Sequence, residues 1–382
     1  MLQNFDIWLL AGKNFAVQRT VVATVANGAL SITAVASIGN AKFSAIQIVP
    51  ADGDAYLHPV PVVPTYVVDY DGDGNEVVPL IGHDSHTHEP GHQLTSWTWT
   101  EGSTVIGMTA DVSVLFPLGQ HVVSLTIGDD NAPPRTDSDS ATFPVVPIDN
   151  VPGVLTSYYS GNGIPLGQLI DSLPSLANFE EVLPSLEIDD LAGMIGGSPY
   201  MSDVVAVMVG KLLVNTAGSY EFTLTGASST RIFLAGSQVT GPIALTPGTY
   251  SVEARFAVDS ASLLPAQVLA SIDGGPAAPI SASSITHDET SLKPFINSMP
   301  DIGSTQGGES VTVSGVGFFS AGMVTVHWCS TNLTGSAITV TPTSIQLITP
   351  AGSGTITVTV ETPNGVSNAV PFTYSGDIVP IK

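Results

Sequence analysis

The stretch "GTITVTVETPNG", residues 354–365, decides the fold class of the chain. Polar and apolar residues alternate along it in the order Thr355, Ile356, Thr357, Val358, Thr359 and Val360. Because successive side chains of a strand point to opposite faces, this alternation predicts a strand with one solvent-exposed face and one buried face. The pair Asn364-Gly365 predicts the turn that closes it. The combination is typical of a β-sandwich.

Similar runs recur along the chain: "ALSITAVASIG" (29–39), "HVVSLTIGDD" (121–130), "SYEFTLTG" (219–226), "GTYSVEARFAV" (248–258) and "VTVSGVGF" (311–318). Gly, Pro, Asn and Asp separate them at short spacing. With 38 Gly and 28 Pro, long helices have little room. The exception is 166–195, where Leu166, Leu169, Ile170 and Leu173 follow a helical period, so only short helices are expected there. The predicted fold class is all-β.

A chain of 382 residues normally holds more than one domain. Linker-like stretches, "VPVVPT" (60–65), "PVVPIDNVPG" (144–153) and "HDETSLKPF" (287–295), divide it into four segments. The expected domains are therefore 1–55, 62–148, 150–288 and 293–375.

The charge excludes several classes of partner. The chain has 33 acidic and 9 basic residues, a formal net charge of -24, which argues against nucleic acid and anionic membrane surfaces. Cys329 is the single cysteine, so no intrachain disulfide framework is expected, and its position after Trp328 predicts a buried, unreactive thiol in a strand. Neither a secretory signal nor an apolar run long enough for a membrane span is recognised.

Residues 62–148 carry "VVDYDGDGNEVVPLIGHDSHTHEPGHQLTSWTW" (67–99) followed by "LGQHVVSLTIGDDN" (118–131). This order of features resembles the PKD family of extracellular Ig-like sandwiches. The resemblance implies that Trp99 is the buried tryptophan that anchors the core. It also implies that the histidine-rich stretch is the loop between the second and third strands.

That stretch places His83, His86, His88 and His92 within ten residues. Imidazoles suit zinc, copper and nickel, so the four side chains are candidate metal ligands. A structural metal site needs fixed ligands and groups that orient them, which a surface loop does not supply. A solvated loop is therefore favoured over a metal site.

Asp69, Asp71 and Asp73 copy the first half of an EF-hand loop, with Gly74 at its turn position. The second half fails, because Leu80 stands where a bidentate Glu is needed and no flanking helices are expected. An Asx-rich turn is the favoured interpretation. Some PKD-like domains bind calcium near their start, so a weak calcium site stays open as the alternative, and no other cofactor is expected.

Residues 150–288 resemble a PA14 domain, a β-barrel module of secreted lectins, adhesins and glycosidases. The resemblance rests on "GVLTSYY" (153–159), "MSDVVAVMVGKLLVNTAGSYEFTLTGASSTRIFLAG" (201–236) and "LTPGTYSVEARF" (245–256). Family members that bind sugar through calcium carry paired aspartates where this chain has Ala227, Ser228 and Ser229, and commonly an Asp at Ala235. Since calcium requires carboxylate oxygens, this domain is expected to be structural.

Residues 293–375 resemble an IPT/TIG domain, another Ig-like sandwich, through "PFINSMPDIGSTQGGESVTVSGVGFF" (294–319) and "NGVSNAVPFTY" (364–374). Within residues 293–375, Asn332-Leu333-Thr334 is a glycosylation pattern that matters only if a eukaryote secretes the chain.

Residues 1–55 resemble the closing part of a malectin-like sandwich through "NFDIWLLAGKNF" (4–15) and "GALSITAVASIGNAKFSAIQIVP" (28–50). This incomplete sandwich is expected to be completed by upstream chain, another copy or a partner.

No nucleophile elbow, P-loop or His-Glu-x-x-His pattern is found, so the chain is not expected to be an enzyme. The four modules predict an extracellular or cell-surface structural or adhesive protein, a stalk or fibre segment that associates with itself or with a neighbouring β-domain protein. One alternative is a carbohydrate-binding, lectin-like surface protein, in which Trp97, Tyr158 or Tyr159 would stack on the sugar rings of glycans. Another is a virion or tail decoration protein.

Overall fold

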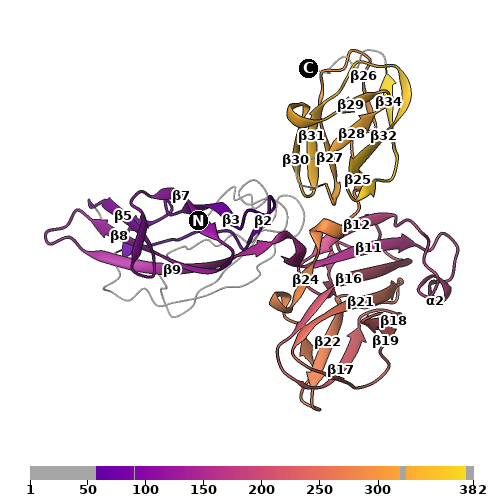
Figure 1. Cartoon of the computed structure of the whole chain (residues 1–382), viewed down its shortest axis with the longest axis horizontal. Coiled ribbons are helices and arrows are strands. Elements are labelled where there is room, and N and C mark those ends of the chain that lie inside the picture. The colour runs from indigo at the N-terminus through magenta and orange to yellow at the C-terminus, as the bar shows by residue number, and fades with distance from the viewer. Residues whose placement is uncertain (1–56, 90, 319–323, 376–382) are drawn as a thin grey trace, which may run out of the picture. The chain divides into compact units, whose positions relative to one another are not determined.

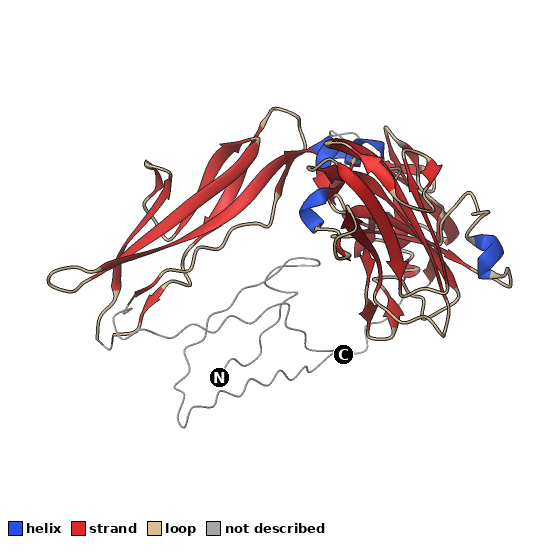
Figure 2. Ribbon diagram, turned by 90° about the horizontal axis from the view of Figure 1, so that it is seen from below, coloured by secondary structure: helices blue, strands red, loops and turns tan. Residues whose placement is uncertain are grey.

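The computed structural model describes residues 57–89, 91–318 and 324–375. Strands dominate this part of the chain, beside one short α-helix and four 3-10 turns (Figures 1 and 2). The all-β prediction is confirmed. The malectin-like prediction for residues 1–55 falls outside the described residues. The chain separates into two compact units, Met1–Pro147 and Ile148–Lys382, and each is described by itself.

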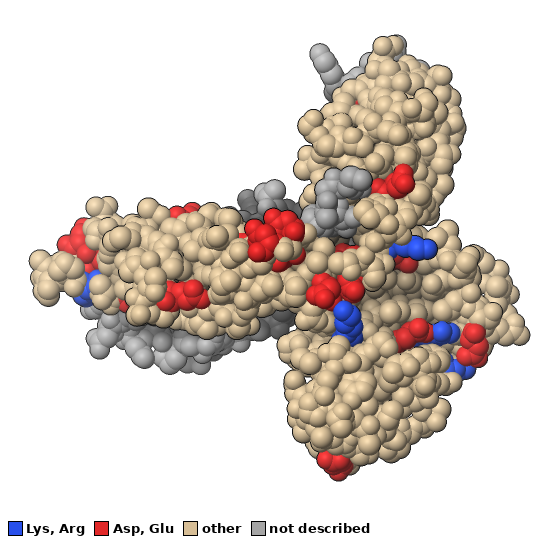
Figure 3. Space-filling view, viewed as in Figure 1, with Lys and Arg blue, Asp and Glu red and all other residues tan. Residues whose placement is uncertain are grey.

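None of the described helices is both long and apolar enough to cross a membrane. Uncharged side chains form most of the surface visible in Figure 3, with acidic groups more frequent than basic ones.

The first sandwich, residues 57–147, is built from two facing sheets and a small strand pair. Its sheets have the orders β2-β9-β8-β5-β6 and β3-β7, and β1 pairs with β4. The strands are β1 (Leu57–His58), β2 (Val67–Asp69), β3 (Asn75–Ile81), β4 (His86–Thr87), β5 (Leu94–Glu101), β6 (Thr104–Gly107), β7 (Asp111–Pro117), β8 (Gly119–Asp129) and β9 (Thr136–Pro147). Trp99 lies fully buried in the core, as predicted, and its Nε1 donates to Ala110 O at 3.2 Å.

The central module, residues 148–292, packs two sheets around one core to form a half-barrel. Its elements are η1 (Ile148–Asn150), β10 (Val151–Pro152), β11 (Val154–Ser160), α2 (Leu166–Leu169), β12 (Phe179–Leu183), β13 (Glu187–Ile188), β14 (Asp190–Leu191), β15 (Met194–Ile195), β16 (Val204–Val214), β17 (Gly218–Thr225), β18 (Ser229–Leu234), β19 (Ser237–Gln238), β20 (Ile243–Leu245), β21 (Gly248–Val258), β22 (Ala266–Ile272), β23 (Ala278–Pro279), η2 (Ala282–Ser284), β24 (Ile285–His287) and η3 (Glu289–Ser291). One sheet runs β10-β24-β16-β21-β18-β19, with β11 joining β12 to β16. The other runs β13-β22-β17-β20, with β23 paired to β22.

The helical prediction for 166–195 holds only at its start. The apolar set Leu166, Leu169, Ile170 and Leu173 does pack together, against Val205, Val207 and Ala257. The α-helix nevertheless ends at Leu169, and the rest of the stretch forms the short strands β12 to β15. Pairing with β11 and β22 supplies hydrogen bonds to β12 and β13 that local propensity alone does not predict.

The C-terminal sandwich, residues 293–375, consists of the sheets β25-β27-β31-β30 and β26-β34-β32-β28-β29, with β33 paired to β32. Its elements are β25 (Phe295–Ser298), β26 (Ile302–Ser304), β27 (Ser310–Val316), β28 (Thr325–Trp328), β29 (Thr331–Leu333), η4 (Gly335–Ala337), β30 (Ile338–Thr341), β31 (Ser344–Ile348), β32 (Gly354–Thr362), β33 (Gly365–Val366) and β34 (Val370–Ser375). The alternation along residues 354–365 places Val358 and Val360 in the core, as predicted.

Two local predictions in this sandwich are wrong. The turn after β32 lies one residue earlier than expected, because Thr362 pairs with Gly365 and leaves Pro363 and Asn364 as the loop. Cys329 is exposed and not buried. It is the first residue of the two-residue loop between Trp328 and Thr331, where φ is 57°, so its side chain points away from the core.

Candidate functional site

The acidic turn between β2 and β3 gathers three carboxylates. Asp69, Asp71 and Glu76 each offer an oxygen within 4.8 Å of the others, which singles them out among the described residues. Asp73 does not join them, and its Oδ1 accepts from Asn75 N at 2.7 Å. Glu76 is the member that the EF-hand pattern misses, because it follows Asp71 by five positions and breaks the alternate spacing of that pattern.

Asp69 is a buried turn residue. Its Oδ1 accepts from Gly72 N at 2.8 Å and its Oδ2 from Gly74 N at 3.0 Å. Both glycines have positive φ, which the turn requires and which glycine adopts without steric cost. These contacts are those of the predicted Asx-rich turn, and a weak calcium site remains a prediction.

The histidines of the loop between β3 and β5 separate into two pairs. His83 Nδ1 lies 2.8 Å from Asp111 Oδ2, and His92 Nδ1 lies 2.9 Å from Asp130 Oδ1. Desolvation opposes ionisation of Asp111, but the hydrogen bonds from His83 and from the backbone lower its pKa. The Gln93 N–H and the His92 ring lower the pKa of Asp130. These two histidines already have carboxylate partners.

The other pair, His86 and His88, lies beside His58 of β1. The sequence does not single out His58, because it lies between the expected domains 1–55 and 62–148, upstream of the histidine-rich loop. Only the pairing of β1 with β4 brings it there.

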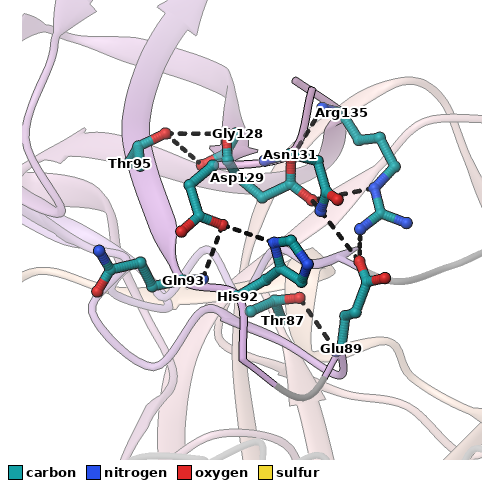
Figure 4. A network of polar contacts seen from close by, with 10 residues as sticks. Thr87, Glu89, His92, Gln93, Thr95, Gly128, Asp129, Asn131 and Arg135 are labelled. Carbon is teal, nitrogen blue, oxygen red and sulfur yellow. Dashed lines mark hydrogen bonds and ion pairs between the residues drawn. The ribbon is translucent and has the colours of Figure 1, made fainter. Parts of the chain in front are cut away.

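A polar network fastens this loop to the turn between β8 and β9 (Figure 4). Asp129 has a buried side chain that accepts from Arg135 Nε at 3.0 Å and from Asn131 Nδ2 at 2.6 Å. The Asn131 Nδ2 group also lies 3.0 Å from Glu89 Oε2, and the Arg135 guanidinium forms an ion pair with Glu89. The loop is at the surface, as predicted, but the premise that nothing fixes it is wrong. Its anchors lie about forty residues further along the chain.

Of the three aromatic residues proposed to stack on sugars, Tyr158 is ruled out. It is fully buried, because β11 is an inner strand paired on both sides, and its hydroxyl donates to Glu181 Oε1 at 2.7 Å. Desolvation and the Glu181 charge raise its pKa. Tyr159 is half-buried against two apolar clusters, and Trp97 packs against the core of the first sandwich. Stacking by Tyr159 or Trp97 stays a prediction.

A groove of about 270 Å³ lies at one end of the central module. Its lining includes the aromatic rings of Tyr220 and Phe222, the apolar side chain of Ile272, and Ser281 and Ser284. Neither Trp97 nor Tyr159 contributes to it. The sequence does not reveal this groove, because its walls come from segments that are separated along the chain.

A joint connects the central module to the C-terminal sandwich. Phe295 and Val316 of the sandwich are buried against Ala177 of the central module, with Leu155 and Tyr159 packed beside them. These contacts lie within the second compact unit. The stretch 287–295, expected to be a linker, is therefore an ordered connection that contains the last residue of β24, all of η3 and the start of β25.

Asn297 completes the joint with two hydrogen bonds to one residue of β12. Its Oδ1 accepts from Glu180 N at 3.0 Å, and its Nδ2 donates to Glu180 O at 2.5 Å. The Glu180 side chain accepts from Ser157 Oγ at 2.9 Å, and desolvation raises its pKa. An amide that satisfies both backbone groups of a strand residue fixes orientation as well as distance.

Asn332, the conditional glycosylation acceptor, is exposed on β29. Its Oδ1 lies 2.9 Å from His327 Nδ1. The position is accessible, and modification there stays a prediction.

One module of the chain matches a known family model. Residues 294–374 match the family model of the IPT/TIG domain, which confirms that resemblance. A comparison with curated proteins finds no match. Similar solved structures include the PA14 domain of the MpAFP antifreeze protein, at 16% identity over 36% of this chain and 92% of that chain with a TM-score of 0.28.

The PA14 sugar-binding domain from an RTX adhesin is similar at 17% identity over 36% of this chain and 99% of that chain, with a TM-score of 0.27. The protein SGBP-B of the Bacteroides ovatus mixed-linkage glucan utilization locus, solved with a mixed-linkage heptasaccharide, is similar at 12% identity. The match covers 84% of this chain and 70% of that chain, with a TM-score of 0.21.

Proposed function

We propose that the chain is a segment of an extracellular or cell-surface structural or adhesive protein, and that this segment is rigid from the central module to the C-terminal sandwich. The joint carries this proposal. A flexible tether leaves two modules free to reorient, whereas buried apolar contacts and the paired hydrogen bonds of Asn297 hold the C-terminal sandwich on the central module. A unit that keeps these two modules at a set separation is suited to act as part of a stalk or spacer. The proposal assigns it no catalytic role.

Two other observations support this function. The connection from β24 to β25 is short and held by hydrogen bonds: Asp288 caps η3 within it, and Asn364 of the loop between β32 and β33 donates from Nδ2 to Leu292 O at 2.9 Å. The strongly acidic composition argues against polyanionic partners. The PKD-like assignment of 62–148 and the malectin-like assignment of 1–55 belong to the same proposal.

Distance measurements between spin labels test the proposal. Ser237 on the central module and Thr339 on the C-terminal sandwich are both exposed, so each accepts a cysteine-linked label in a Cys329→Ser background. We expect a narrow distance distribution. Replacing Phe295 by Ala, or Asn297 by Ala, is expected to broaden it. A broad distribution in the unaltered joint would show that the segment is flexible and would overturn the proposal.

Carbohydrate binding is the second candidate function, because the central module has a groove with aromatic walls. Glycan-array binding by the whole chain distinguishes the structural function from the carbohydrate-binding function. The structural proposal expects no glycan signal, whereas a carbohydrate-binding role expects a signal that Phe222→Ala removes.

A further inference from the structure

Three imidazoles share one face of the strand pair β1 and β4. His58 and His86 are directly opposite each other in the antiparallel register, and His88 follows His86 by two positions. Residues two apart in an extended segment point to the same side, and directly opposed residues are neighbours across the pair. The topology thus places His58, His86 and His88 together, and we call them the histidine face.

The centroids of the three rings are spaced as in metal-bound imidazoles. Their centroids lie 5.1 Å apart for His58 and His86, 5.9 Å for His58 and His88, and 4.6 Å for His86 and His88. Zinc–nitrogen bonds of about 2.0–2.1 Å in tetrahedral directions hold imidazole centroids about 5 Å apart. The three rings must turn before their nitrogens converge on an ion, because among the described residues only Asp69, Asp71 and Glu76 have ligand atoms within 4.8 Å of one another.

One ring is already oriented by a backbone group. His86 Nδ1 lies 3.0 Å from Asp84 O, and since a carbonyl oxygen only accepts, Nδ1 must carry the proton. In the neutral ring, this leaves the lone pair of His86 Nε2 available to a metal ion. Metal-binding histidines in proteins almost always donate their second ring N–H in this way.

Acidic side chains lie near the histidine face. Asp137 and Asp139 of β9 lie close enough to His58 to act on it electrostatically, and their negative charge favours a bound cation.

We propose that the histidine face binds one divalent transition-metal ion of the zinc, copper and nickel class. His58, His86 and His88 are its three protein ligands, and water fills the open position. Imidazole-only sites suit these metals, whereas calcium and magnesium prefer oxygen ligands. The sequence favours a solvated loop because it shows neither His58 beside the loop nor the network that fastens the loop to the turn after β8.

The test uses the full chain without an affinity tag, stripped of metal with a chelator. Calorimetric titration with zinc is expected to give one ion per chain, and titration with copper(II) is expected to give a paramagnetic resonance spectrum with several nitrogen ligands. The variants His58→Gln and His88→Gln are expected to weaken zinc binding at least about tenfold. Removing only a hydrogen-bond partner of a metal ligand already costs about this much affinity, and these variants remove a ligand itself. His88 is exposed, so its replacement leaves the core intact.

The matched control is the double variant His83→Gln/His92→Gln. It removes two histidines of the same loop that contact Asp111 and Asp130, and it is expected to bind zinc as the unaltered chain does. Circular dichroism of each metal-free variant checks its fold. The absence of saturable binding of zinc, copper(II) and nickel(II) would overturn the proposal. Binding that survives in His58→Gln but is lost in the control would overturn it as well.

Discussion

At the residue scale, Cys329 sits in a left-handed backbone conformation that disfavours most side chains, at a cost of roughly 1–2 kcal/mol. Asn tolerates this conformation better. We expect Cys329→Asn to raise the free energy of unfolding by about 0.5–1 kcal/mol. Urea denaturation measures this change, with Cys329→Val as the control that lowers stability. If Val is as stable as Cys, the backbone argument is wrong.

His327 makes the C-terminal sandwich sensitive to pH. Its Nδ1 lies 2.9 Å from Asn332 Oδ1 and its Nε2 lies 2.6 Å from Glu361 Oε2, and these two contacts raise its pKa. A raised pKa in the folded state adds stability below the unfolded value of about 6.5, and that stability is lost as the pH rises through the folded value.

The melting temperature of the unaltered chain should therefore fall more between pH 6 and pH 8.5 than that of His327→Gln. An NMR titration of His327 measures the shift directly. Equal pH dependence of the two proteins would contradict this assignment.

Asp69 stabilises its turn through two backbone N–H groups. We expect Asp69→Asn to lower the free energy of unfolding by about 1–3 kcal/mol in calcium-free buffer, because an amide offers only one accepting oxygen. Calcium is expected to leave the melting temperature of the unaltered chain unchanged. A saturable rise with calcium that is absent in Asp69→Asn would instead establish the weak calcium site.

At the scale of elements, the joint couples two modules that have separate cores. We expect the central module and the C-terminal sandwich to unfold in one transition, and Asn297→Ala to separate it into two. Asn368→Ala is a matched control, because Asn368 bonds to the N and O atoms of Ile296 in the same way but within one sandwich. It should lower stability without separating the transitions. Differential scanning calorimetry distinguishes these outcomes.

Strand positions and buried faces could be predicted from alternation alone, as Val358 and Val360 show, because a period of two is a local property. The features that alternation missed depend on distant partners. The strand β12 forms because β11 lies beside it, and Asn364 is a loop residue because Thr362 pairs with Gly365.

The same limit applies to the candidate site. The histidine-rich loop was visible in the sequence, but its division into two pairs depends on Asp111, Asp130 and His58, each from another element. Tyr158 was misassigned because nothing adjacent to it reveals that β11 is an inner strand.

At the scale of the whole molecule, the net charge of -24 sets how copies of the chain meet. Like charges repel over a distance that salt shortens from about 30 Å at 0.01 M to about 8 Å at 0.15 M. The predicted self-association should therefore strengthen as ionic strength rises. Sedimentation equilibrium over this salt range measures the association constant. An assembly that salt dissociates would show that attraction between opposite charges holds it together.

The pairing of β2 with β9 has a counterpart in the pairing of β26 with β34. Both pairs are parallel, and each joins an early strand of a sandwich to its last one: Val67 lies opposite Val145, and Ile302 lies opposite Thr373. When a sandwich is pulled from its two ends, the paired strands are drawn in opposite directions along their length. The hydrogen bonds between them are then loaded in shear, together, and do not open one at a time as in an unzipping hairpin. Each sandwich thus has a clamp that resists tension along the chain, whatever its resistance to heat or denaturant.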